Sequence, residues 1–192
     1  MNNSARESIL GSIRTHLAAS PAPDDHPVTP ANPVILSNSD PINRFKESLE
    51  AVSGHCIVTT DVTDSLKQIL TDLNAERIAN SNDPPNAHDI FSFDVGISTA
   101  QAGIAETGTL ILDSACERHR LVSLVPPVHI AIINASAIVA TLADALTLLQ
   151  QKEISPAITF ITGPSRTADI ELTLTIGVHG PQELYVIVDE SK

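Results

Sequence analysis

Residues 56–79 read CIVTTDVTDSLKQILTDLNAERIA, and this stretch indicates the fold class. Its first four residues form an apolar, β-branched run that is typical of a buried strand. Thr63–Leu73 then has the pattern of a helix, and Arg77–Ala79 that of a second, weaker strand. A strand, a helix and another strand in succession are typical of a parallel sheet, in which helices connect the strands. We therefore predict an α/β fold with a mostly parallel sheet flanked by helices.

Later segments continue this pattern. A helix that opens at Asp40 and another over Thr141–Gln150 are predicted from their capping residues and apolar stripes. The stretch Asp169–Ile176 alternates like a strand, but the following Gly177 and the need for a crossover favour a helix, which we predict there. Further strands are predicted over Asp94–Ile97, Thr109–Leu112, Leu121–Val125, His129–Ile133, Ala157–Ile161 and Leu184–Val188.

The N-terminal part differs in composition from the rest of the chain. Residues 4–18 have apolar side chains on one helical face, and Ser20–Pro33 follows with five prolines. Such a stretch cannot continue a helix and has little to bury. We predict an N-terminal helix over residues 1–19, a Pro-rich linker over 20–39 and an α/β domain over 40–192.

Charge and cysteine content exclude several classes of function. The formal net charge is −12, with eleven basic residues against twenty-three acidic ones, which argues against nucleic-acid binding. Two cysteines, Cys56 and Cys116, are too few for a cluster held by four thiolates, so we expect no metal and no cofactor on this chain. The longest apolar tract, Leu121–Ile133, is broken by two prolines and is too short to span a bilayer. Without a recognisable leader, a cytoplasmic protein with no membrane insertion is expected.

A first candidate site is the motif GIAETGT at residues 103–109. Glycines allow backbone N–H groups to approach a ligand, and threonines add hydroxyl donors, so we predict anion contacts from Gly103, Thr107, Gly108 and Thr109. Flanked by apolar residues, Glu106 could be desolvated into a general base or nucleophile, and we name it as the catalytic candidate. The alternative is a carboxylate that holds a turn by accepting backbone N–H groups.

The second candidate is TGPSRTADIE at residues 162–171, which follows a predicted strand and opens the predicted helix. Helix N-termini attract anions, and in open α/β sheets ligands bind beyond the carboxyl ends of strands. A guanidinium and two hydroxyls would bind a small carboxylate or phosphate, so we predict anion contacts from Gly163, Ser165, Arg166 and Thr167. Arg120 could add a further contact, while His129 and His179 have the character of structural histidines. An ordinary helix cap is the alternative for this motif.

Several motifs in order also resemble a known family. AETGT at 105–109, LVPPVHI at 124–130, the 162–171 motif and GVHG at 177–180 are similar to the LutC/YkgG family of lactate-utilisation proteins, which carry a LUD domain. The resemblance covers nearly the whole chain. It implies a fold like the NagB/RpiA/CoA transferase group. It also implies a role in oxidising L-lactate to pyruvate beside two iron–sulfur-type partner subunits, which would hold the redox centres.

Three functions follow as hypotheses. The first is a non-redox subunit of a lactate-oxidising complex that binds a small anion. The second is a free-standing isomerase or CoA-transferase-like enzyme, in which Glu106 acts by analogy with the glutamate nucleophile of some CoA transferases. The third is a non-catalytic sensor of small anions that uses Arg166.

Overall fold

The structure is a computed structural model that describes residues 3–19, 40–83, 86, 89–117, 119–150, 155–167, 175–176 and 179–191. The chain divides into two compact units, Met1–Pro33 and Val34–Lys192. In the first unit, helix α1 (Asn3–Ala19) forms where the apolar stripe of residues 4–18 predicts it. The predicted linker, residues 20–39, lies outside the described residues.

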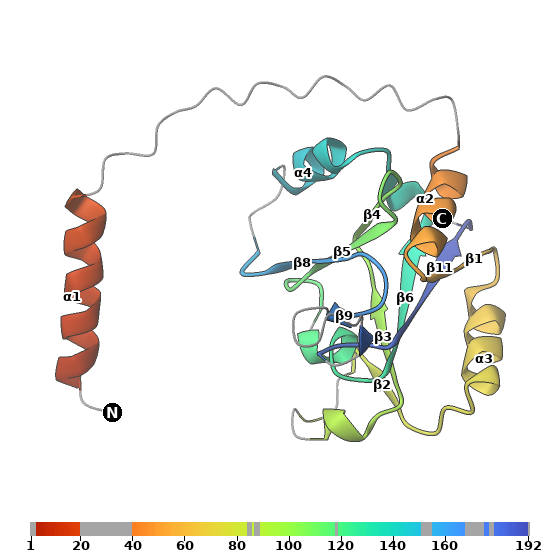
Figure 1. Cartoon of the computed structure of the whole chain (residues 1–192), viewed down its shortest axis with the longest axis horizontal. Helices are drawn as coiled ribbons and strands as arrows, with labels where there is room; N and C mark the ends of the chain where they lie inside the picture. Colours follow the sequence, from red (N-terminus) through yellow and green to blue (C-terminus); the bar gives the residue numbers. More distant parts are fainter. Residues whose placement is uncertain are drawn as a thin grey trace. The chain divides into compact units, whose positions relative to one another are not determined.

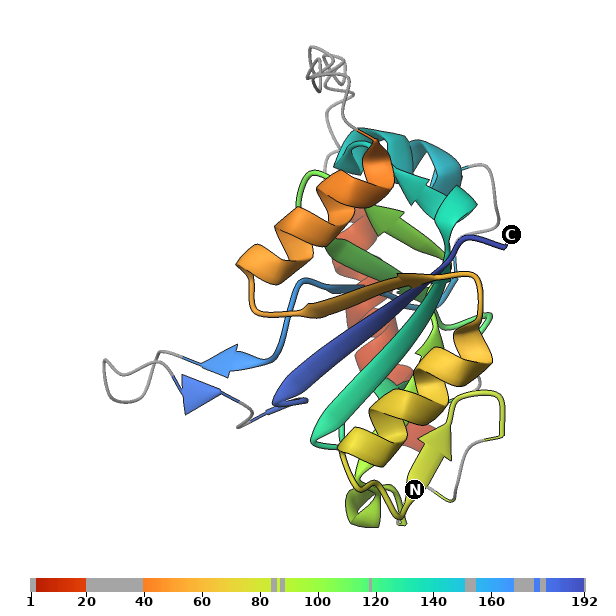
Figure 2. The same cartoon turned by 90° about the vertical axis from the view of Figure 1, so that its right-hand side faces the viewer.

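The second unit is built on a five-stranded sheet in which all neighbours are parallel (Figures 1 and 2). The strand order is β1-β11-β6-β3-β2. The strands are β1 (His55–Thr59), β2 (Ile78–Asn80), β3 (Val95–Thr99), β6 (Val128–Asn134) and β11 (Glu183–Asp189). The predicted α/β class with a mostly parallel sheet is confirmed.

A second sheet of four shorter strands adds antiparallel pairs. Its order is β7-β4-β5-β8, where β5 pairs antiparallel with both neighbours and β7 runs parallel to β4. The strands are β4 (Ala102–Ile104), β5 (Thr109–Asp113), β7 (Ile138–Val139) and β8 (Ile158–Ile161). A further two-stranded ribbon pairs β9 (Arg166–Thr167) with β10 (Thr175–Ile176).

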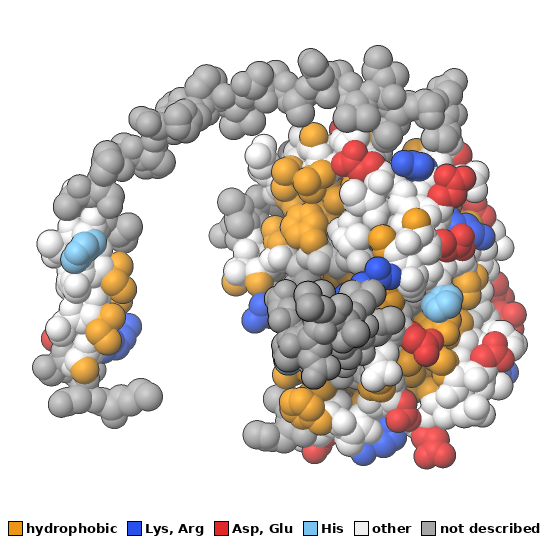
Figure 3. All heavy atoms as spheres, in the orientation of Figure 1, with side chains coloured by type: hydrophobic (Ala, Val, Ile, Leu, Met, Phe, Trp, Pro, Cys, Tyr) orange, Lys and Arg blue, Asp and Glu red, His pale blue; other side chains and the backbone are white. Residues whose placement is uncertain are grey.

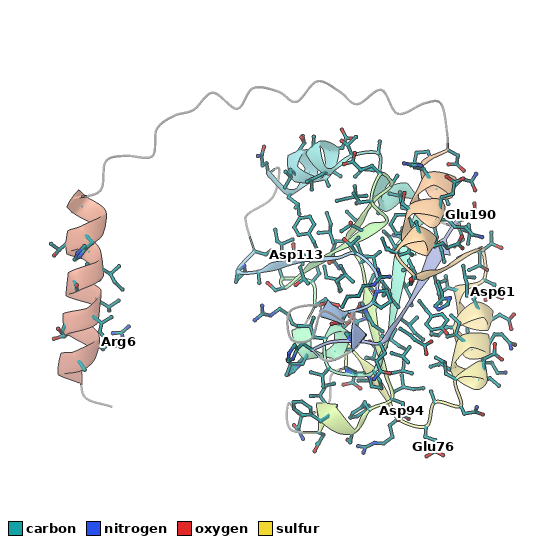
Figure 4. The ribbon with its side chains drawn as sticks, viewed as in Figure 1. Arg6, Asp61, Glu76, Asp94, Asp113 and Glu190 are labelled. Atoms are coloured by element: carbon teal, nitrogen blue, oxygen red, sulfur yellow. The ribbon has the colours of Figure 1, made fainter. Side chains whose placement is uncertain are left out.

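Exposed aspartates fix the ends of several elements. Helix α2 (Pro41–Ala51) begins at Asp40, whose carboxylate accepts the backbone N–H of Ile42 at 3.2 Å. Helix α3 (Val62–Asp72) begins in the same way at Asp61 (Figure 4). Asp94, at the start of β3, accepts the N–H of Arg77 at 2.8 Å and so fixes the start of β2 beside it (Figure 4). These backbone hydrogen bonds lower the pKa of the Asp94 carboxyl.

Helix α4 (Leu142–Gln150) starts with a reciprocal cap. The Thr141 hydroxyl donates to Asp144 Oδ2 at 2.7 Å, and the Asp144 N–H donates to Thr141 Oγ1 at 3.2 Å. The helix therefore begins where the sequence predicts it.

The parallel sheet is covered on both faces, as parallel sheets require. Alternation along β6 sends Ile130 to the face that packs on α3, and Ala131 and Ile133 to the opposite face. That opposite face packs on α2 and on the second sheet, whose far side is covered by α4 through Ala145. Figure 2 shows α2 and α3 on opposite sides of the parallel strands.

Short 3₁₀ helices replace one predicted strand. Besides η1 (Ile90–Ser92) and η3 (Ala135–Ala137), η2 covers Arg120–Ser123. The predicted strand at Leu121–Val125 is therefore wrong. A Cβ on Gly96 would lie 1.8 Å from the carbonyl oxygen of Val122, so η2 lies directly on the backbone of β3 rather than beside it. Its apolar side chains are buried by this stacking, not by sheet pairing.

The helix predicted over Asp169–Ile176 is also wrong at its end, because Thr175–Ile176 forms strand β10. Its register with β9 pairs Ile176 with Arg166. This placement fits the alternation of apolar residues in the segment. Residues 168–174 lie outside the described residues.

The surface carries both charge and apolar patches. Figure 3 shows acidic side chains over the α2 and α3 side, and an apolar patch over α4 and β8. Leu142, Leu146 and Phe160 are each 44% exposed there. Among the helices in the described ranges, none is both long and apolar enough to cross a membrane.

We expect Gly96→Ala to lower the free energy of unfolding by about 3 kcal/mol, because the new Cβ would collide with the Val122 carbonyl. Urea unfolding measures this change. Gly11→Ala in α1 is the control, since no atom lies within 4 Å of its new Cβ, and it should not lower stability because alanine favours a helix more than glycine does. Equal effects of the two substitutions would contradict the close approach of η2.

Candidate functional site

A pocket of about 210 Å³ lies between the parallel sheet and strand β8. It is found at the N-terminal ends of β6 and β11, and at the C-terminal end of β8, rather than beyond the carboxyl ends of the parallel strands. Its wall combines apolar side chains with hydroxyls and two imidazoles. The lining residues that matter below are Ser123, His129, Thr162, Gly163, Ser165 and His179.

The second sequence motif contributes only part of this wall. Gly163 and Ser165, two of the predicted anion contacts, line the pocket. Arg166 is engaged elsewhere, because its Nη2 donates to Val52 O at 2.7 Å and to Ser53 Oγ at 2.8 Å. Its guanidinium thereby satisfies the C-terminal end of α2, where a cation is favourable. The backbone of Thr167 belongs to β9.

The first motif forms the turn of a hairpin between β4 and β5. Gly103 lies within β4, and a Cβ there would come within 2.9 Å of the Ile133 side chain. Gly108 has a φ of +64°, and a Cβ there would lie 2.3 Å from the backbone nitrogen of Leu49 in α2. Both glycines therefore allow close packing of the hairpin on its neighbours.

Threonine hydroxyls connect the two motifs. Oγ1 of Thr109 lies 2.7 Å from Oγ1 of Thr107 and 2.7 Å from Oγ1 of Thr162. Thr162 lines the pocket, whereas the other two are absent from its lining. The contact aligns the end of β8 with the start of β5.

Glu106 contacts helix α4. Its Oε1 accepts the backbone N–H of Leu142 at 2.8 Å, and its own N–H donates to Ala140 O at 3.1 Å. A carboxylate at this position satisfies a free N–H at the helix start and is favoured by the helix dipole. Glu106 is not among the pocket-lining residues, and neither is the exposed Arg120, which begins η2. The catalytic role of Glu106 stays a prediction.

Beneath the pocket, a buried polar chain crosses the interface between the layers. Ser98 Oγ lies 2.7 Å from Nε2 of His129, and the two side chains are each 1% exposed. Glu117, which is 5% exposed, hydrogen bonds the same serine side chain. β3 and β6 bring the first two together, because Gly96 pairs with His129 and Ser98 follows on the same face.

Burial shifts the pKa values of both ends of this chain. Loss of solvation raises the pKa of Glu117 to about 7, with the Ser98 hydrogen bond acting in the opposite direction. Loss of solvation also lowers the pKa of His129 to about 4. The imidazole is therefore neutral at physiological pH, and the carboxyl exchanges its proton near neutrality. Perturbed groups next to a pocket are candidates for a functional site.

Three buried side-chain atoms have no hydrogen-bond partner in the described part of the chain: Glu117 Oε1, His119 Nδ1 and His129 Nδ1. Buried polar atoms are almost always paired, because an unpaired one costs about 1–3 kcal/mol. All three belong to the segment that leads through η2 into β6. Their concentration there makes this segment a candidate for ligand contacts.

The sequence interpretation missed Ser98 and Glu117 and treated His129 as structural. One signal could have found two of them, because Ser98 directly follows the predicted strand Asp94–Ile97 and His129 begins the predicted apolar strand His129–Ile133. Nothing in the local pattern indicates that Glu117 joins them.

Neither cysteine lines the pocket. Burial raises the pKa of the Cys56 thiol to about 11, so its thiolate is suppressed. Cys116 is exposed. Within the described ranges, no three His, Cys, Asp or Glu side chains gather closely enough to hold a metal ion.

Comparison with known families now identifies the domain. The sequence model of the LUD domain matches residues 61–188. The chain belongs to the LUD domain family. This confirms the resemblance seen in the sequence motifs, and the matched region of the LUD domain contains Ser98, Glu117 and His129 together with the pocket-lining residues.

Relatives of this LUD domain differ in how much of their length they share with it. An uncharacterized protein, NMB1437 of Neisseria meningitidis serogroup B, is 40% identical over 79% of this chain and 68% of its own length. Lactate utilization protein C of Macrococcus caseolyticus is 32% identical over 75% of this chain and 79% of its own length. The protein of that name from Bacillus subtilis is 39% identical over 50% of this chain, and the match spans less than half of that relative, 42%.

A solved structure supports the fold. The crystal structure of a DUF162 family protein from Deinococcus radiodurans superposes on this LUD domain with a TM-score of 0.58. The match covers 80% of this chain and 98% of the other, at 21% identity. At this identity the similarity concerns the fold alone.

We expect Glu106→Ala to lower the free energy of unfolding by about 1 kcal/mol, because Leu142 loses its N-terminal cap. Glu106→Gln should cost less, since the amide oxygen still accepts that N–H. Urea unfolding measures both, with exposed Glu47→Ala as the control. An unchanged midpoint in Glu106→Ala would contradict the capping role. Loss of turnover in Glu106→Gln at unchanged stability would instead support the predicted catalytic role.

The stability of the domain should depend on pH through Glu117. Its raised pKa means that the folded state keeps a proton between about pH 4.5 and 7 that the unfolded state has released, so stability falls as pH rises through this window. The lowered pKa of His129 acts in the opposite direction between about pH 4 and 6.5. Glu117→Gln should remove the first effect and leave stability that rises with pH.

Urea unfolding of the wild type and Glu117→Gln across this range tests the expectation. The difference between the two should grow with pH by at most ~1.4 kcal/mol per unit. Glu190→Gln, at an exposed position, is the matched control for loss of one carboxylate. Parallel stability curves for the wild type and Glu117→Gln would show that Glu117 is not buried as described.

Proposed function

We propose that this chain is a non-redox component of a cytoplasmic L-lactate oxidation system, in which lactate is converted to pyruvate. The observation that carries the proposal is the match to Lactate utilization protein C of Macrococcus caseolyticus, which extends over most of both chains. The family membership of residues 61–188 supports it.

The proposal assigns the redox chemistry to iron–sulfur partner subunits. This chain has two cysteines, Cys56 and Cys116, and a cluster held by thiolates normally needs four. The role left for this chain is to bind a small anion and to contribute to the complex.

The pocket beside His129 is the place where we propose that the anion binds. Ser165 and Thr162 offer hydroxyls and His179 offers an imidazole ring, while no Lys or Arg is among the lining residues that the structure describes. Such a wall suits a singly charged carboxylate better than a phosphate dianion, which proteins usually bind with Arg or Lys.

An in-frame deletion of the gene in the native host tests the role in lactate oxidation. We expect loss of growth on L-lactate as sole carbon source and unchanged growth on pyruvate, because only the step from lactate to pyruvate is removed. A plasmid copy of the gene should restore growth. Normal growth on lactate, in a strain that lacks any parallel lactate-oxidising enzyme, would contradict the proposal.

Affinity purification from the same host, grown on L-lactate, tests the partner subunits. The proposed complex should carry the visible absorption of iron–sulfur clusters and oxidise lactate. If the chain is instead purified alone and colourless, a free-standing enzyme that uses Glu106 or a small-anion sensor becomes the better hypothesis.

A further inference from the structure

The buried polar chain below the pocket has a feature that packing does not require. Ser98 connects Glu117 to Nε2 of His129, and the second ring nitrogen of His129 has no partner in the described residues. His129 lines the pocket together with Ser165 and His179, and its Nδ1 is buried. A neutral imidazole has one N–H and one lone pair, so the bond at Nε2 sets the role of Nδ1.

With a proton on Glu117, the hydrogen bonds run in one direction. The carboxyl donates to the Ser98 oxygen, and the Ser98 hydroxyl donates to Nε2 of His129. The imidazole proton then sits on Nδ1, which becomes a hydrogen-bond donor.

Without that proton, every bond in the chain reverses. The Glu117 carboxylate accepts from the Ser98 hydroxyl, and the Ser98 oxygen accepts from Nε2–H. Nδ1 of His129 then carries a lone pair. Between the two states, the Glu117 proton moves to Ser98, and the Ser98 proton moves to Nε2. The proton on Nδ1 is released, so the chain loses one proton in total.

We propose that Ser98, Glu117 and His129 form a hydrogen-bond relay, through which the proton on Glu117 sets whether Nδ1 of His129 donates to a 2-oxo or a 2-hydroxy carboxylate in the pocket, or accepts from the hydroxyl of a 2-hydroxy carboxylate alone. This inference rests on the proposed function and adds the residues that distinguish the two acids. A hydroxyl both donates and accepts, so it matches Nδ1 in either state, whereas a carbonyl oxygen only accepts and matches the N–H alone.

The pocket suits such small ligands. Its volume of about 210 Å³ leaves room for a molecule of three carbons with a carboxylate. Leu124 and Leu184 provide apolar contacts for a methyl group, and Ser165 and His179 provide polar contacts for the carboxylate.

The surroundings allow both states of the relay. Burial raises the pKa of Glu117 to about 7, so both of its forms are populated near neutrality, and His129 stays neutral throughout. The other ionisable groups on the bordering elements are His119 beside η2, Arg120 at its start, Asp113 at the end of β5 and His179 across the pocket. His179 lines the same pocket, so it would contact hydroxy and oxo acids alike.

The tautomer of His129 gives a direct test in the full chain. Long-range ¹H–¹⁵N NMR of histidine-labelled protein separates the Nδ1–H form from the Nε2–H form. We expect Nδ1–H at about pH 5.5 and Nε2–H at about pH 8.5. The same tautomer at both pH values would overturn the relay. The measurement uses the wild-type protein, so it does not depend on the folding of a variant.

Ligand binding tests the proposed specificity. Calorimetry with L-lactate, pyruvate and propionate compares a hydroxyl, a carbonyl and neither group on the same carbon skeleton. The ratio of the pyruvate Kd to the lactate Kd should increase about tenfold from about pH 5.5 to about pH 8.5, since pyruvate loses its hydrogen bond to Nδ1 while lactate keeps one. Propionate, which offers neither group, serves to remove any common effect of His179.

Ser98→Ala should abolish the pH dependence of this ratio, because Glu117 no longer reaches His129. Ser81→Ala, which removes another buried serine hydroxyl outside the pocket, should retain it. A constant ratio in the wild type, the same pH dependence in Ser98→Ala, or no binding of lactate and pyruvate would each overturn the inference. Growth of the deletion strain on lactate tests the proposed function separately, so the relay and the proposed function can fail independently.

Discussion

The bare backbone at Gly96 allows the rest of the site to form. With no side chain there, the carbonyl oxygen of Val122 lies directly on β3, and η2 stacks on the parallel sheet. This contact brings Ser123 to the pocket wall and leads the chain from Glu117 into β6. Any larger residue at position 96 would separate η2 from the sheet, and the pocket would lose one wall.

Buried polarity beside this contact is costly in an interior that is otherwise aliphatic. The side chains of Ala131, Ile133 and Leu184 share the face on which Ser98 and His129 lie. A single hydrogen bond joins these two, and one nitrogen of the ring is left without a partner in the described residues. Folds retain such arrangements mainly where they serve function, since an apolar replacement would pack at lower cost.

The two sequence motifs have structural roles around α2 and α4. Gly108 allows the hairpin to pack on the backbone of α2. Arg166 donates a hydrogen bond to a carbonyl oxygen at the C-terminal end of the same helix. Glu106 caps α4. The glycine and the charged residues of these loops contact the protein's own helices, and their predicted anion contacts stay a prediction. Of the predicted anion contacts, Gly163 and Ser165 line the pocket.

Local pattern alone determined the class of this protein and most of its elements. The alternation in β6, the stripes of α2 and α3, and the caps at Asp40, Asp61 and Thr141 are set by neighbours a few residues apart, so periodicity and capping rules predict them. The error at Leu121–Val125 has a different source, because an apolar run can be buried by stacking as well as by pairing.

Tertiary structure decided which side chains meet. Ser98, Glu117 and His129 come from a strand, a loop and a second strand, and strand order together with register brings them to one point. The tertiary structure also places Arg166 against the end of α2 and His129 at the pocket. Contacts of this kind depend on the packing of whole layers, whereas the sequence pattern reports only whether each residue lies on a buried or an exposed face.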